Sequence, residues 1–167
     1  MKAILLTVVT FLCGIVGAMG QSLETRVISS CRSVPPTLYN FTTLLDVSYS
    51  QFIALMKQAG YKIDENGSRI EMSNMHLDCF MDNNNGVGVN HWTYDVRTSE
   101  VHCYISDGAG DGSLAELISA LRVHYVGKGR YGADIYQYLN GGYEYTYIIV
   151  GDANITTVIA VKRGRTR

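Results

Sequence analysis

The sequence predicts an α+β fold in which an antiparallel sheet of about five or six strands is packed by one or two helices. Residues 143–161 contain two β-branched and aromatic runs on either side of the turn residues 151–154, a pattern typical of a β-hairpin. Further short apolar runs are separated by turn clusters. Segments 46–59 and 113–127 have apolar residues at helical spacing.

Both runs of this hairpin are apolar on two faces, which is typical of central strands. One face of the first run carries Tyr143, Tyr145, Tyr147 and Ile149, and the second run alternates β-branched residues in the same way. The rest of the chain is therefore expected to cover this hairpin.

Residues 1–20 are expected to be a secretory signal peptide. Lys2 forms a short positive region, residues 3–16 are almost wholly apolar, and the sequence around Gly20 suits cleavage before Gln21. The apolar run is shorter than the ~20 residues that span a bilayer. We expect residues 21–167 to form one secreted domain with a basic C-terminal tail and no membrane span.

Secretion would allow the cysteines to form a disulfide and three sequons to be glycosylated. Three cysteines in an oxidising compartment predict one disulfide and one unpaired thiol. Cys79–Cys103 is favoured because both cysteines lie in predicted strands, and Cys31–Cys103 is the alternative. Glycosylation sequons, each expected in a loop or turn, begin at Asn40, Asn66 and Asn154.

In chain order, residues 21–40 are expected to lie across the surface without helix, because Pro35 and Pro36 interrupt them. The first helix is predicted at 46–59, with Asp46 or Ser48 at its start and Gly60 at its end. A small hairpin follows, and further strands are expected at 75–81, 91–96 and 101–105.

The Gly/Asp loop at 106–113 has two aspartates four residues apart. It lacks the further carboxylates of a calcium loop, so a connector is the favoured interpretation. A second helix is predicted from a capping box of Ser113 and Glu116 to Gly127. A strand at 131–139 and a turn at 140–142 lead into the central hairpin.

Composition and motifs limit the possible chemistry. The net charge of −1 provides no overall attraction to nucleic acid. The chain has no metal-binding histidine pattern, CxxC, P-loop or GxSxG motif, so we expect no metal and no cofactor. His102 is expected to point away from its neighbour Cys103. His76 is the best candidate base, although an ordinary strand histidine would give the same pattern.

Two segments resemble the small secreted guanyl-specific ribonucleases of fungi. Residues 52–74, FIALMKQAGYKIDENGSRIEMSN, resemble the helix and first hairpin that precede a Tyr-x-His strand in that family. Residues 142–164, GYEYTYIIVGDANITTVIAVKRG, are similar to its closing hairpin. The resemblance covers about a third of the mature chain. It implies a microbial-ribonuclease-like fold and a site with a base, an acid and an arginine that stabilises phosphoryl charge.

When the catalytic residues of that family are placed on this sequence by position, only His76 matches one of them well. The family's glutamate falls near residues 132–133, with Asp134 close by, while its arginine falls at about Tyr147 and its last histidine at about Val161. Most of the catalytic set is thus missing, as in the ribonuclease-like effectors of plant-pathogenic fungi.

That resemblance implies a secreted, monomeric, non-enzymatic effector that binds a host protein or RNA outside or inside host cells. An active endoribonuclease using His76, Asp134 and a basic residue such as Arg163 is one alternative. A small secreted inhibitor or ligand-binding module is another. Aromatic and basic residues would form the binding surface, unless the tyrosines only pack a sheet face; these residues are Tyr136, Tyr138, Tyr143, Tyr145, Tyr147, Lys162, Arg163 and Arg165.

Overall fold

The computed structural model describes residues 21–28, 31–66, 69–74, 90–106, 112–152 and 155–164. Several sequence-based expectations lie outside these residues: the signal peptide, the strand at 75–81 with His76 and Cys79, most of the Gly/Asp loop, Asn154 and Arg165. The side chains of Cys31 and Asn66 also fall outside the description. The disulfide and these two sequons therefore stay predictions.

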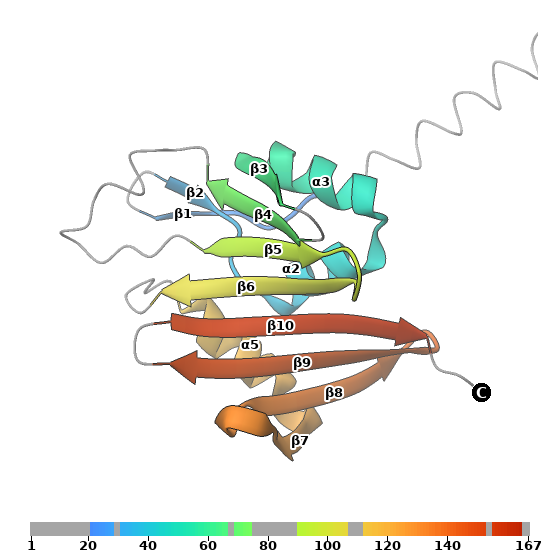
Figure 1. The fold of residues 1–167 in the computed structure, drawn as a ribbon. Coiled ribbons are helices and arrows are strands. Elements are labelled where there is room, and N and C mark those ends of the chain that lie inside the picture. The colour runs from blue at the N-terminus through green and yellow to red at the C-terminus, as the bar shows by residue number, and fades with distance from the viewer. Residues whose placement is uncertain are drawn as a thin grey trace, which may run out of the picture.

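The α+β class is confirmed, and the sheet is wider than the five or six strands expected. Eight antiparallel strands lie in the order β3-β4-β5-β6-β10-β9-β8-β7 (Figure 1). Their bounds are β3 (Tyr61–Asn66), β4 (Arg69–Asn74), β5 (His91–Asp95), β6 (Glu100–Ser106), β7 (Tyr125–Lys128), β8 (Asp134–Asn140), β9 (Tyr143–Asp152) and β10 (Ile155–Gly164).

The sheet consists of two meanders that meet at the β6–β10 pair. Strands β3 to β6 follow one another in sequence and in space, and so do β7 to β10. The two halves join where Cys103 lies opposite Val158 in register. The predicted central hairpin β9–β10 is confirmed, because both of its strands have neighbours on either side.

In the part of the chain that the structure describes, two helices precede the sheet where one was expected. They are α2 (Leu38–Asp46) and α3 (Tyr49–Gln58). Ser48 caps α3 as predicted: its hydroxyl accepts the Gln51 amide hydrogen bond, and the Gln51 side chain accepts from the Ser48 amide. The expectation of a helix-free lead-in was wrong for α2, because Thr37 caps a new helix directly after the two prolines.

The last helix, α5 (Ser113–Leu121), connects the two halves of the sheet, and its ends differ from the prediction. The capping box is absent, because Gly112 takes the N-cap position with φ of 72° and Ser113 is buried. The helix ends six residues before Gly127. A 3₁₀ turn, η1 (Arg122–His124), and strand β7 follow, since the β-branched and aromatic residues there favour extended backbone.

The described helices lie on one face of the sheet, and the core lies between them and that face (Figure 1). Phe41 of α2 packs against Trp92 and Tyr147, with ring centroids 4.9 and 5.6 Å apart. All three side chains are fully buried. Leu117 and Leu121 of α5 complete this core beside them.

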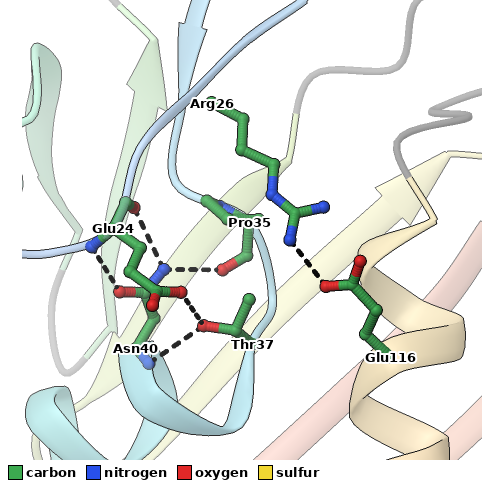
Figure 2. Close-up of polar contacts among 6 residues, drawn as sticks. All are labelled: Glu24, Arg26, Pro35, Thr37, Asn40 and Glu116. Atoms are coloured by element: carbon green, nitrogen blue, oxygen red, sulfur yellow. Dashed lines mark hydrogen bonds and ion pairs between the residues drawn. The ribbon is translucent and has the colours of Figure 1, made fainter.

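The N-terminal segment is held in the fold and does not simply lie across its surface. A short ribbon of β1 (Arg26–Ile28) and β2 (Cys31–Ser33) precedes the buried residues Val34–Pro36. Figure 2 shows how it is fastened: the Thr37 hydroxyl donates to the Glu24 carboxylate at 3.0 Å. In addition, Arg26 pairs with Glu116 of α5 at 2.6 Å.

Asn40 does not lie in the loop that its sequon suggested. It is in the first turn of α2, its side chain is fully buried, and its amide nitrogen donates to the carbonyl oxygens of Glu24 and Pro35 at 3.1 and 2.9 Å (Figure 2). Because both amide hydrogens are used and no solvent reaches the side chain, this fold has no room for a glycan there.

Candidate functional site

The five tyrosines predicted to bind RNA or a partner lie on the face of the sheet that the helices cover. Tyr147, Tyr145 and Tyr136 are only 0%, 2% and 6% exposed. Burial raises the pKa of the Tyr147 and Tyr136 hydroxyls. These three side chains therefore belong to the core, and the prediction that they present a binding surface was wrong.

Tyr138 extends this packing at the side of α2. Its ring stacks on Tyr145 and Tyr147 with centroid distances of 4.9 and 6.1 Å, and the ring of His124 lies 5.3 Å away. The Tyr138 and Thr42 hydroxyls are 3.2 Å apart. The tyrosine-rich stretch is thus explained by packing, the alternative that the sequence left open.

Lys162, one of the basic residues predicted to form the binding surface, is part of strand β10 of the folded sheet. Its Nζ lies 2.8 Å from Asp46 Oδ1, which also accepts a 2.6 Å hydrogen bond from the Tyr145 hydroxyl. The ammonium lies 4.0 Å from the centre of the Tyr143 ring, a cation–π contact. Partial burial opposes the charged form, yet Asp46 and Tyr145 raise the pKa of Lys162 overall. The cluster ties the end of α2 to β9 and β10.

Asp134, the predicted partner of His76, lies at the start of β8. Its carboxylate is 2.7 Å from Lys128 Nζ, and this contact lowers the pKa of Asp134. A lowered pKa suits a permanently charged ion-pair partner and not a general acid. His76 lies outside the described residues, so the pairing of these two residues stays a prediction.

The opposite face of the sheet is the one on which no described helix lies (Figure 1). One row of residues crosses it in register from Thr93 on β5 through His102, Ile159 and Ile148 to Ile135 on β8. Directly paired residues of antiparallel strands point to the same side, so these side chains share that face. His102 thus lies on the side opposite to the buried Cys103, as expected.

Polar and titratable side chains gather at one end of this row, and we call them the sheet-face cluster: His91, Thr93, Glu100, His102 and Tyr104. His102 Nε2 lies 3.1 Å from Glu100 Oε2, with the two side chains 8% and 26% exposed. The Tyr104 ring lies 5.8 Å from His91 and 6.3 Å from His102, measured between centroids. The buried Thr93 hydroxyl has no hydrogen-bond partner among the described residues.

This cluster holds the groups that general acid–base chemistry uses. The Glu100 carboxylate orients the His102 ring through this contact, and the second imidazole, that of His91, lies on the adjacent strand. Sequence reasoning missed the cluster because it weighed His102 only against Cys103. The pattern Glu-x-His-x-Tyr at 100–104 was the available signal, since alternate residues of a strand share a face.

Among the predicted binding residues that the structure describes, only Arg163 lies on this same face. It is exposed on β10 opposite Glu144, two residues beyond Val161, which pairs with Glu100. Arg163 and Glu100 are therefore diagonal neighbours, at a separation of about 7–8 Å between their backbones.

Small hollows also occur in the described part of the chain. Two hollows between the N-terminal segment and α3, lined in part by Leu55 and Gln58, hold about 40 and 130 Å³. Both are below the several hundred Å³ of a usual small-molecule site. No three His, Cys, Asp or Glu side chains among the described residues are placed to bind a metal. None of the described helices has the length and apolar character needed to cross a membrane.

Comparisons with known proteins do not assign the fold or the cluster to a family. No family model, curated protein or solved structure matches the chain. The ribonuclease-like interpretation accordingly continues to depend on the residues of the two resembling segments.

Proposed function

We propose that this chain is a secreted, monomeric, non-enzymatic protein with a ribonuclease-like frame, which acts as an effector by binding a host protein. The observation that supports the non-enzymatic function most directly is the burial of Tyr147. Tyr147 occupies about the position of the family's catalytic arginine, and it is fully buried in the core behind Phe41. A phosphate clamp must reach its substrate, so this position supplies none.

A protein target is favoured over RNA by charge and by the burial of the tyrosines. The chain has a net charge of −1, and nucleic-acid affinity depends mainly on the neutralisation of phosphates by lysine and arginine. Sequence-tolerant RNA binding also needs exposed aromatic rings for stacking. Three of the five tyrosines proposed for that role are no more than 6% exposed.

The experiment is incubation of oxidised mature protein, from Gln21 onward, with total RNA, followed by gel analysis of the products. We expect intact RNA at protein concentrations at which a secreted fungal ribonuclease degrades it completely. Degradation by the purified protein would overturn the non-enzymatic proposal.

An active endoribonuclease is the second candidate, because Glu100 and His102 form a 3.1 Å pair on the helix-free face. In that case the pair would accept the 2′-hydroxyl proton, and His91 on the next strand would protonate the leaving oxygen. His102→Ala would then abolish cleavage. His124→Ala is the matched control, because His124 contacts Tyr138, on the covered face. Loss of cleavage in both variants would count against this candidate.

A further inference from the structure

We propose that the edge of the sheet formed by residues 122–131 is the docking surface for an acidic segment of the partner protein. This inference deepens the proposed function and rests on it. We call the surface the basic edge; its side chains are Arg122, Val123, Tyr125, Val126, Arg130 and Tyr131. It comprises η1, the outermost strand β7 and the turn η2 (Arg130–Gly132), at the lower end of the sheet in Figure 1.

The basic edge exposes an unusual amount of apolar side chain. Val123 is 85% exposed, Val126 60% and Tyr131 94%, and Tyr125 is 48% exposed beside them. Single exposed apolar residues are normal on any protein. Four of them within ten residues, interspersed with arginines, have the composition of a protein-binding surface, in which tyrosine and arginine carry most of the energy.

Charge favours an acidic partner. The chain has no acidic residue between Glu116 and Asp134, whereas Arg122, Lys128 and Arg130 lie in that stretch. Asp134 neutralises Lys128, but neither arginine forms an ion pair with a carboxylate of the described residues. Two exposed guanidinium groups therefore give this edge a positive charge, although the chain as a whole is slightly negative.

Tyr131 has a strained backbone with no packing that compensates for it. Its φ and ψ of 58° and 25° are left-handed values that tyrosine rarely adopts. The side chain is almost fully exposed, so burial in this chain does not offset the cost. Strain of this kind gathers at functional sites, and here it holds the ring outward, where it can anchor a partner.

The structure argues against three other occupants. Strand β7 has four residues, a register irregularity between Tyr125 and Gly127, and ends in Lys128. These features block the addition of another strand, so the contact is made by side chains. Nucleic acid would stack on the tyrosines but would gain nothing from the two valines. A second copy would bring the arginines of both chains together.

The test is titration of ¹⁵N-labelled mature protein with a random glutamate–tyrosine copolymer, and separately with poly(U). We expect the copolymer to shift amide signals of residues 122–131 and poly(U) to leave them in place. Arg122→Glu combined with Arg130→Glu should weaken copolymer binding about tenfold or more. Lys57→Glu combined with Lys62→Glu makes the same charge change at exposed positions on α3 and β3 and should leave binding unchanged.

No shifts at 122–131, equal weakening by the two double variants, or binding of poly(U) at this edge would overturn the inference. Those outcomes leave the RNA-cleavage test untouched. The docking surface and the non-enzymatic function can therefore fail independently.

Discussion

The side chain of Asn40 pairs with the backbone of Glu24 as a neighbouring strand would. Asn40 Oδ1 accepts a hydrogen bond from the Glu24 amide at 2.8 Å, and Asn40 Nδ2 donates to the Glu24 carbonyl at 3.1 Å. Asn40 Nδ2 donates a third hydrogen bond to the Pro35 carbonyl, so both hydrogens of the side-chain amide are used (Figure 2). One buried amide thus holds two segments of the N-terminal region on α2.

We expect Asn40 to carry no glycan in the folded, secreted protein, although it begins a sequon. Asn40→Asp replaces two donated hydrogen bonds with a carboxylate facing carbonyl oxygens, and should cost on the order of 2 kcal/mol of unfolding free energy. Glycopeptide mass spectrometry and urea denaturation measure the two effects. Thr42→Val is the control for glycosylation, since it removes the sequon and keeps the amide, and its loss of the Tyr138 contact should cost less than the Asn40 substitution. A glycan on Asn40 of folded protein would contradict this account.

Lys162 and Asp46 should be energetically coupled. Their side chains are 21% and 35% exposed, so solvent screening limits the expected coupling energy to about 0.5–1 kcal/mol. A double-mutant cycle of Lys162→Met and Asp46→Asn, followed by chemical denaturation, measures it. The more exposed pair Lys128–Asp134 is the control and should show no measurable coupling. Equal coupling in both pairs would contradict the anchoring role of Lys162.

Tyr61 should make stability fall at alkaline pH. Its buried hydroxyl accepts the Val34 amide hydrogen bond at 3.1 Å, and burial raises the pKa of Tyr61 from 10.0 to about 12. The folded state keeps this proton where the unfolded chain loses it. The contribution of the protonated Tyr61 hydroxyl to the free energy of unfolding is therefore complete below pH 10. It is lost as the pH rises through about 12, at about 1.4 kcal/mol for each pH unit.

Urea denaturation between pH 9 and 12, a range spanning the two pKa values, measures this slope for the wild type and for Tyr61→Phe. In the variant, the slope of the unfolding free energy against pH should be smaller by the contribution of one proton. The contributions of the other buried tyrosines to this slope should remain. It should also be less stable at pH 7 by about 1 kcal/mol, because the Val34 amide loses its acceptor. Identical slopes for the two proteins would show that Tyr61 does not titrate in this way.

Tyr131→Asn should stabilise the protein by about 0.5–1 kcal/mol. Asparagine adopts the left-handed conformation more readily than tyrosine, and the exposed ring contributes no packing that would be lost. Thermal and chemical denaturation test the change. Val123→Asn, at an equally exposed position without positive φ, should stay within about 0.5 kcal/mol of wild type. A destabilised Tyr131→Asn would mean that the ring packs in solution.

Local patterns predicted the strands well. The β5–β6 and β9–β10 hairpins appear where alternation and turn residues placed them, because both signals act over a few residues. The start of α2 also had a local signal, with Thr37 as cap and Leu38, Phe41 and Leu44 at helical spacing. The two prolines exclude a helix only up to Pro36, so they do not oppose a helix that begins at Leu38.

The covered face of the sheet could not be read from the strands themselves. In β9 the tyrosine face and the face of Ile148 are both apolar, so alternation does not decide which one is buried. Phe41 and Leu117, far away in the sequence, decide it by packing on the tyrosines. The same long-range choice leaves Glu100 and His102 on the other face, which is why the predicted and observed candidate sites differ.

The most direct test of the central claim is the conversion of dinucleoside monophosphates, followed by ³¹P NMR with oxidised mature protein. We predict that no 2′,3′-cyclic phosphate forms above the rate of a buffer control. Cyclic phosphate that forms with the wild type, disappears with His102→Ala and persists with His124→Ala would contradict the claim and establish a nuclease on the sheet face.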